Sequence, residues 1–446
     1  MRGFRSTLIL FAVLVGLVAY IYFVESAKPT TPAGEEAKQK VFSVTADKIA
    51  EVAVKPASGG PTVLQKADGS WQIVQPIQSA ADDSEVSGLT SNLASLEIQR
   101  VVDDNPRDLK QYGLAQPRVD VGFKAAGDKG ERHLLIGDKT ATGGDLYAKL
   151  QNEKRVFLIS AYLDSTFNKS TFDLRDKSVL KFDRNKVDSV ALASLDKDVQ
   201  LAKRGEDWSL TKPVQAPADY GTVEGLIGRL QTAQMKSLVA ADPKDLKEYG
   251  LDKPEASATL GAGSARATLE IGKKTADGTL YARDTSRPAV FTVEAGLLDE
   301  LKKPSDDYRR KDLFECRPYN ATRVEVTRGP DTWAFEKVKG QGKDATEKWR
   351  QVAPTARDVD AANMDAFLTK LTNMRAQSWA AAGTRTGIDQ PVLTATARFE
   401  DGKKQERVVF GKAGSDVYAS RTGEPGAAKV DSVEFEDALK ALDALK

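Results

Sequence analysis

The chain has 446 residues, which at roughly 150 residues per domain suggests about three domains. Its 65 Lys and Arg residues nearly equal its 64 Asp and Glu residues. This balance argues against a protein that coats nucleic acid, because counterion release requires an excess of clustered cations. The single cysteine, Cys316, and the single histidine, His133, exclude an intramolecular disulfide and a zinc site with four Cys or His ligands from one chain. A serine or cysteine nucleophile would have to use His133 as its base.

An apolar run near the N-terminus predicts a membrane anchor. Residues 8–24 read LILFAVLVGLVAYIYFV and contain no charged residue. As a helix, a run of about 17 residues reaches about 25 Å, which is short but sufficient for one crossing of a bilayer. Arg2 and Arg5 precede the run, so the positive-inside rule predicts a cytoplasmic segment at residues 1–7. We therefore expect residues 8–24 to cross the lipid bilayer of the inner (cytoplasmic) membrane once. The C-terminal bulk of the chain would then be extracytoplasmic, in the periplasm.

A cleaved signal peptide is the alternative interpretation of this run. Its apolar region would usually hold about 7–15 residues and end at a cleavage site of small residues. Glu25-Ser26-Ala27 is the only candidate for that site, and a bulky acid occupies its first position. Residues 25–41 are polar and contain proline, and we interpret them as a flexible linker.

After the linker, the sequence repeats itself three times. Four blocks recur in the same order at a spacing of roughly 137 residues, which is typical of tandem small domains. We assign repeat unit 1 to residues 42–180, unit 2 to residues 181–315 and a degenerate unit 3 to residues 316–446. The blocks are a Trp block (71–76, 208–213, 349–354), a Tyr-Gly-Leu block (108–117, 245–254, with a remnant at 387–391), an Ile-Gly block (136–140, 271–275, 410–412) and a Leu-Tyr-Ala block (146–148, 280–282, 417–419).

Each unit is predicted to adopt an α+β fold. Alternating apolar and polar residues predict antiparallel-leaning strands, and apolar residues at three/four spacing predict one main amphipathic helix per unit. Asp83 or Ser84, Asp219 and Asp360 are the expected helix starts. The apolar stripes of these helices are Val86, Leu89, Leu93 and Leu96; Val223, Leu226, Ile227 and Leu230; and Met364, Phe367, Leu371 and Met374.

Two segments resemble active-site signatures, but we interpret them as short capped helices. Asn105 and Asp242 suit the N-cap, and each is followed by a proline, which suits the first helical position. Gly113 and Gly250 suit the left-handed residue that ends a helix.

Residues 272–275 (Gly-Lys-Lys-Thr) resemble a phosphate-binding loop. That loop needs a glycine five residues before the Gly-Lys pair and a Ser or Thr directly after it. Position 267 is alanine and position 274 is lysine. We therefore interpret these residues as part of a hairpin between two strands.

Aromatic and acidic residues offer two further kinds of site. Trp71, Trp208 and Trp349 could be stacking platforms for sugars, but one tryptophan at the same place in each unit favours a core residue. The acidic pairs could perform glycosidic acid/base chemistry, but charge pairs usually form solvated faces. These pairs are Asp82-Asp83, Asp103-Asp104 and Asp306-Asp307.

The remaining candidates are expected to be structural. His133 is expected on the outward side of a strand, where unit 2 has Thr268, and Cys316 is expected to be a small buried residue. Residues 309–311 (Arg-Arg-Lys) are expected to form a surface or domain-interface strip. We assign no residue to catalysis, to a cofactor or to a metal, and we expect no cofactor.

The anchor followed by the four repeated blocks resembles a bacterial family catalogued as domain of unknown function 4340. The resemblance covers residues 42–446, clearly in the first two units and less clearly in the third, which lacks the tyrosine of the Tyr-Gly-Leu block and gains Trp333 and Trp379. Members of that family often occur beside gliding-motility-type ABC transporter components, so the resemblance implies an accessory role in the cell envelope. It implies no catalytic residues.

Our leading hypothesis is a non-enzymatic, membrane-anchored extracytoplasmic scaffold or accessory protein of an ABC-type transport or gliding-type envelope complex. Its partner would be a protein of the inner membrane or envelope, and nucleic acid is not expected. A glycan- or cell-wall-binding array is the alternative, and it requires exposed tryptophans. A carboxylate-based hydrolase is a weaker alternative that requires two facing acids in a cleft.

Overall fold

The computed structural model of the chain describes residues 39–339 and 347–445. The predicted cytoplasmic segment (1–7), the predicted anchor (8–24) and most of the predicted linker (25–41) lie outside these residues. Among the residues that are described, no helix combines the length and the hydropathy needed to cross a membrane.

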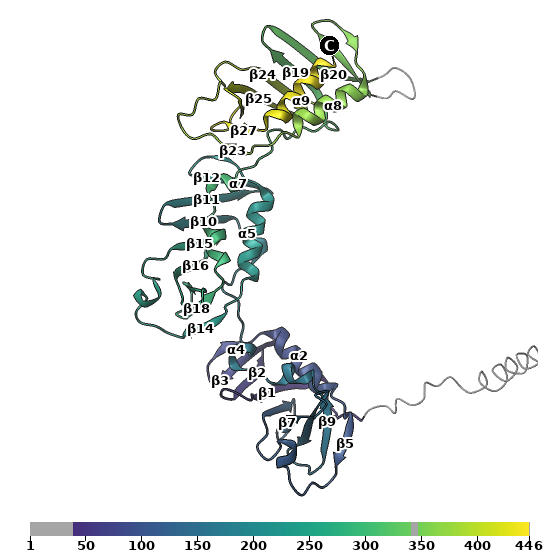
Figure 1. Cartoon of the computed structure of the whole chain (residues 1–446), viewed down its shortest axis with the longest axis vertical. Coiled ribbons are helices and arrows are strands. Elements are labelled where there is room, and N and C mark those ends of the chain that lie inside the picture. The colour runs from purple at the N-terminus through teal and green to yellow at the C-terminus, as the bar shows by residue number, and fades with distance from the viewer. Residues whose placement is uncertain (1–38, 340–346, 446) are drawn as a thin grey trace, which may run out of the picture. The chain divides into compact units, whose positions relative to one another are not determined.

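Three nine-stranded antiparallel sheets, one per repeat, form the body of the protein (Figure 1). This confirms the tandem repeated modules and the antiparallel pairing. The modules are mostly β, whereas the sequence predicts α+β. The sequence also misses short edge strands such as β4 (Ser79–Ala80), β13 (Ala216–Pro217) and β22 (Arg357–Asp358), because two residues carry no readable alternation.

The strand order is the same in all three sheets. The first sheet runs β4-β3-β2-β1-β6-β7-β8-β9-β5 and contains β1 (Ile49–Lys55), β2 (Thr62–Ala67), β3 (Ser70–Gln75), β4, β5 (Arg100–Asp103), β6 (Val119–Ala125), β7 (Arg132–Lys139), β8 (Asp145–Leu150) and β9 (Val156–Ser160). The second runs β13-β12-β11-β10-β15-β16-β17-β18-β14 and contains β10 (Ser189–Ser194), β11 (Lys197–Arg204), β12 (Asp207–Lys212), β13, β14 (Ser237–Ala240), β15 (Ala256–Ala262), β16 (Ala265–Lys274), β17 (Leu280–Asp284) and β18 (Val290–Val293). The third runs β22-β21-β20-β19-β24-β25-β26-β27-β23 and contains β19 (Ala321–Arg328), β20 (Asp331–Lys339), β21 (Glu347–Ala353), β22, β23 (Ser378–Trp379), β24 (Leu393–Phe399), β25 (Lys404–Ala413), β26 (Asp416–Arg421) and β27 (Ala428–Val430).

A helix of 12 or 13 residues follows the fourth strand of each module, as predicted, but the third module has a second helix of 12 residues, α9 (Ser432–Asp443), which packs against the first. The helices that follow the fourth strands are α2 (Asp83–Ala94), α5 (Tyr220–Thr232) and α8 (Ala361–Thr372). Asp219 and Asp360 cap α5 and α8 as predicted. The cap of α2 is Asp82, one residue before the predicted Asp83, because Asp82 accepts from the backbone N–H groups of Ser84 and Glu85. The other helices are α3 (Leu163–Phe167), α4 (Thr171–Leu174), α6 (Gly296–Leu301), α7 (Ser305–Tyr308) and α9 (Ser432–Asp443), and the 3-10 turns are η2 (Ala46–Lys48), η3 (Lys110–Tyr112), η4 (Arg184–Lys186) and η5 (Lys247–Tyr249).

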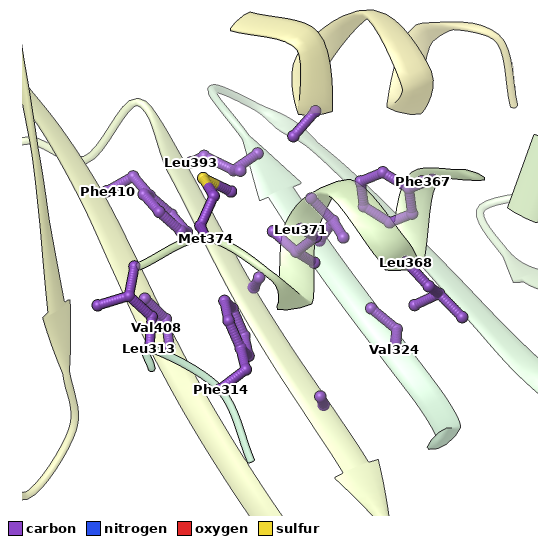
Figure 2. Packing of buried hydrophobic residues seen from close by; sticks show 14 of the residues in the cluster. Leu313, Phe314, Val324, Phe367, Leu368, Leu371, Met374, Leu393, Val408 and Phe410 are labelled. Atoms are coloured by element: carbon purple, nitrogen blue, oxygen red, sulfur yellow. The ribbon is translucent and has the colours of Figure 1, made fainter. Parts of the chain in front are cut away.

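The described chain divides into two compact units, one ending at Lys177 and one beginning at Ser178. The second unit contains the second and third modules. In the third module, Phe314 belongs to the same buried core cluster as Leu371 of α8 and Val408 of β25 (Figure 2). Leu313 and Phe314 precede β19, so the segment that leads into the third module supplies part of its core.

The Tyr-Gly-Leu and Ile-Gly blocks pack against each other in the first two modules. The carbonyl oxygen of Tyr249 lies so close to Gly272 that a Cβ on the glycine would stand 2.2 Å from it, and the corresponding distance from Gly137 to the Tyr112 oxygen is 2.1 Å. Gly272 lies at a register shift between β16 and β17, which form the predicted hairpin. These glycines are therefore required for close packing and not for a phosphate loop.

The predicted caps of the Tyr-Gly-Leu segments are only partly correct. Gly113 and Gly250 have φ of 67° and end η3 and η5 in the left-handed conformation, as predicted. Asn105 and Asp242 do not cap them. The helical turn starts later than predicted, and Asp108 and Asp245 accept from the backbone N–H groups of the residues two further along.

Replacing Gly272 by alanine should destabilise the protein. The added methyl group would overlap the Tyr249 carbonyl, and overpacking of this kind typically costs about 1–3 kcal/mol. Gly225→Ala in α5 is the matched control, because nothing lies within 4 Å of the added atom and alanine favours a helix by up to about 1 kcal/mol. Urea unfolding should therefore shift in opposite directions for the two variants, and an unchanged midpoint for Gly272→Ala would contradict this packing.

Candidate functional site

The tryptophans of the first two Trp blocks lie in the core. Trp71 is 5% exposed and Trp208 is 3% exposed. In the second module, Nε1 of Trp208 donates to Oε1 of Glu224 at 3.1 Å. Trp349 is only partly buried against the third core, which already contains Trp333 from the neighbouring strand. The core interpretation is thus confirmed for Trp71 and Trp208 and holds in part for Trp349.

The acidic pairs of the first module hold backbone groups in place. Asp82 caps α2, and Oδ1 of Asp83 accepts from the backbone N–H of Trp71 at 3.0 Å. Oδ1 of Asp103 accepts from the backbone N–H of Asn105 at 2.9 Å. These contacts give the carboxylates structural roles, as expected for charged residues at helix starts and turns.

His133 lies on β7 between two carboxylates. Its Nδ1 is 2.8 Å from Oδ1 of Asp120 and its Nε2 is 2.9 Å from Oε2 of Glu131. Burial lowers the pKa of His133, but the hydrogen bonds and charges of Asp120 and Glu131 outweigh burial and raise the pKa above its ordinary value. Lys124 pairs with Glu131 at 3.2 Å and partly balances the two acids. His133 is therefore held in a charge cluster on the sheet, with a carboxylate at each ring nitrogen.

Because His133 is the only histidine, its titration can be followed directly by proton NMR. We expect its pKa to lie above that of an exposed histidine and to fall in Asp120→Asn. A raised folded-state pKa gives stability that is present below the unfolded-state pKa and lost as the pH rises through the folded-state pKa. Asp128→Asn is the control, because Asp128 pairs with Arg132 and not with the imidazole. An Asp120→Asn titration curve identical to that of the parent protein would contradict the assignment.

The best-developed site among the described residues lies where the second module joins the third. The joining segment, residues 309–316, is hereafter the 2–3 linker. Glu406 of β25 is buried against the 2–3 linker, and its side chain is 2% exposed. Its two carboxylate oxygens accept from the backbone N–H groups of Cys316 at 2.8 Å and Glu315 at 2.9 Å. A buried carboxylate of the third module thus binds the backbone of the linker.

Arginines connect this carboxylate to the rest of the junction. Arg421 of β26 lies 3.0 Å from both Glu406 and Glu315, and 3.1 Å from Glu424. Arg310 of the linker lies 2.7 Å from Glu315 and 3.2 Å from Glu424. Two arginines therefore alternate with three glutamates in one network, in which each charge has an opposite neighbour.

Arg309 adds a cation–π contact with Trp379 to the junction. Its guanidinium carbon lies 3.3 Å from the ring centroid of Trp379 on β23, and its Nη2 donates to the carbonyl of Pro425 at 2.8 Å. Only 5% of the Arg309 side chain is exposed, and burial lowers its pKa. Desolvation of this kind strengthens a cation–π contact. The expected interface strip at residues 309–311 is therefore observed as an interface within the second unit.

A cavity of about 520 Å³ opens beside the junction. Its walls are charged and aromatic and include Trp208, Tyr220, Arg310, Asp312, Glu315 and Lys404. Burial raises the pKa of Glu315, but its hydrogen bonds with Arg310 and Arg421 outweigh burial and hold the pKa below its ordinary value. A general acid needs a raised pKa, so Glu315 is unsuited to that role.

The single thiol is equally unsuited to chemistry. Burial, followed by the charge of Glu406, raises the pKa of Cys316 to about 12, so the thiolate that would attack a substrate is scarce. Within the described parts of the chain, no group of three or more His, Cys, Asp or Glu side chains could hold a metal ion. What the structure shows at the junction is a set of contacts that join the linker to the third module.

The charge pattern of the sequence predicts a surface or domain-interface strip that includes Arg309 and Arg310, but it misses the residues that contact them. Glu406 and Arg421 occupy the register positions of Ala267 and Asp284 in the second module, so no repeated pattern marks them. Trp379 is visible in the sequence only as an added tryptophan of the third unit.

Glu406→Gln should weaken the junction strongly. The variant leaves Arg421 without its buried partner, and breaking a buried pair typically costs about 3–5 kcal/mol. Urea unfolding and limited proteolysis of the linker should both report the loss. Glu400→Gln is the matched control, because Glu400 pairs with Lys404 at a half-exposed position and such pairs are worth about 0–1 kcal/mol. Equal effects of the two substitutions would show that the buried network does not secure the linker.

Comparisons with known proteins give one informative match. A family described as "Domain of unknown function (DUF4340)" matches residues 71–207 and 208–391. Each match begins at a tryptophan strand, β3 or β12, and so starts two strands into a module. No curated protein matches the chain. Among solved structures, the chain is similar to a DNA polymerase sliding clamp from Pseudomonas aeruginosa, crystallised with ligand, at 9% identity over 87% of this chain and 92% of the clamp, with a TM-score of 0.14 that carries no argument about fold.

Proposed function

The chain belongs to the family of the domain of unknown function DUF4340, and from that premise we propose that it is a non-enzymatic, membrane-anchored scaffold or accessory protein of the cell envelope. Residues 8–24 would form its single crossing helix in the inner membrane, and the three modules would lie outside the cytoplasm. Its partner would be a protein of the inner membrane or envelope, in an ABC-type transport or gliding-type complex.

The observation that carries this proposal is that the recurring residues of the modules have structural roles. Trp71 and Trp208 fill cores, Gly137 and Gly272 allow close backbone packing, and the acids of the first module bind backbone N–H groups. A repeated unit whose shared residues all serve the fold is suited to presenting surfaces. Such a unit near a membrane raises the effective concentration of its surfaces for a membrane partner.

The junction of the second and third modules supports the same interpretation. The arginine–glutamate network and the Arg309–Trp379 contact join two modules through buried charges and an aromatic ring. A joint of this kind favours a fixed presentation of the two modules. Both alternatives receive less support. Buried Trp71 and Trp208 cannot stack on sugars, and Glu315 has a lowered pKa.

The proposal is tested first by location. In native membranes, the full chain should resist alkaline carbonate extraction. The double substitution Leu14→Arg and Leu17→Arg should release it, because each central arginine costs about 2.5–3.5 kcal/mol on insertion. Leu14→Ile with Leu17→Ile is the matched control and should stay in the membrane fraction.

The second arm identifies the partner. Affinity purification of the tagged full chain from detergent-solubilised membranes should recover a transporter subunit or another envelope protein, and the double arginine variant should not. A parent protein found in the soluble fraction would overturn the anchor. Repeated recovery of no membrane or envelope component by an anchored protein would overturn the accessory role.

A further inference from the structure

The outer face of each sheet carries a central pair of residues that differs among the modules. The pairing positions hold Gly122 and His133 in the first sheet, Thr259 and Thr268 in the second, and Thr396 and Arg407 in the third. On β6, β15 and β24, the neighbours on the buried side stay apolar in all three modules: Val121 and Phe123, Ala258 and Leu260, and Ala395 and Ala397. The fold therefore tolerates different residues at this outer-face pair, and these residues can be suited to binding a ligand.

In the third module, this place is a hollow of about 360 Å³. Arginine and threonine side chains dominate its lining: Arg323, Arg398, Arg407, Thr327, Thr394 and Thr396. Guanidinium and hydroxyl groups are hydrogen-bond donors, and guanidinium groups match the oxygens of an oxyanion in pairs. The volume lies in the range of sites for small molecules.

Two of the three arginines lack an acidic partner. Arg323 pairs with Glu336 at 2.6 Å and more loosely with Glu325 at 3.9 Å. Arg398 donates from Nε only to the neutral Gln405, at 3.0 Å. Within residues 39–339 and 347–445, no carboxylate forms an ion pair with Arg398 or Arg407. Glu325 also lines the hollow and lies directly opposite Thr396, but its ion pair is with Arg323. The charges of Arg398 and Arg407 therefore remain without an ion-pair partner among the described residues.

The strand register makes this arrangement unfavourable for the protein alone. Arg323 lies directly opposite Arg398 across β19 and β24, and like charges at such positions destabilise a sheet. The first module places Glu51 opposite Lys124 at the same positions, with an ion pair of 2.8 Å. The second module places Ser189 opposite Gly261. Only the third of the described sheets keeps like charges there, which an anionic ligand would stabilise.

We propose that the outer face of the third module binds a small ligand through a phosphate group, held by Arg398, Arg407 and the hydroxyl of Thr396. Arg407 lies diagonally from Arg398, and Thr396 lies directly opposite Arg407. Diagonal neighbours across a pair of strands are about 7–8 Å apart, which long side chains can bridge with one ligand group. A phosphate monoester carries about −1.5 to −2 charges and three acceptor oxygens at neutral pH, so one group matches two guanidinium groups and a hydroxyl.

Equilibrium dialysis of the detergent-solubilised full chain against radiolabelled inorganic phosphate tests the proposal. We expect saturable binding at low ionic strength that weakens as chloride is added, because exposed charges are screened. Arg407→Thr should weaken binding by roughly tenfold or more, as expected for loss of a charge-assisted hydrogen bond. This variant installs the residue that the second module carries at the same position, so it should fold, and its thermal unfolding should match that of the parent protein.

Arg385→Thr is the matched control. Arg385 is an exposed arginine of the same module, makes no ion pair with any described residue and does not line the hollow. It should bind phosphate as the parent protein does. Equal loss in both variants, or the absence of saturable phosphate binding by the parent protein, would overturn the site. Tighter binding of citrate than of phosphate would overturn the choice of a phosphate group.

Discussion

The backbone of a segment that joins two modules must find hydrogen-bond partners outside any sheet, because buried backbone groups without partners are costly. In the second unit, charged side chains of the module that follows the segment supply them. Glu406 accepts two N–H groups of the 2–3 linker. At the start of the second module, Arg287 donates to the carbonyls of Ser178 and Val179 at 2.9 Å and is itself paired with the buried Asp284 at 3.0 Å. The second and third modules thus use opposite charges to hold the segments that lead into them.

This constraint explains why the junctions diverge while the modules persist. The inward faces of the sheets are mostly apolar in every module, since each packs against the helices of its own module. The leading segments and the outer faces have no such requirement. The outer-face position holds His133 in the first module, Thr268 in the second and Arg407 in the third. The leading segment is bound by Arg287 in the second module and by Glu406 in the third. At these two places the modules can acquire separate roles.

Much of the repeat and of the secondary structure was predictable from the sequence. The order of the blocks predicts three modules, and the spacing of Val223, Leu226 and Leu230 predicts α5 with its cap at Asp219. The edge strands were not predictable, because β13 and β22 are pairs of residues held only by their neighbours. The start of η3 was misplaced, since Asp108 competes with Asn105 for the role of cap and both are suitable residues. The junction was predictable only from its cationic side, because Glu406 and Arg421 are far from the linker in sequence and match nothing in the other modules.

The position of Cys316 makes the reactivity of its thiol an indicator of whether the surrounding structure is intact. The sole thiol is fully buried at the end of the linker, and its neighbours keep it protonated. Cys316 belongs to the core cluster of the third module, so a soluble alkylating reagent can reach it only when that core opens locally beside the linker. The rate of alkylation therefore measures how often the start of the third module opens, and it can be read at the one native thiol without an engineered cysteine.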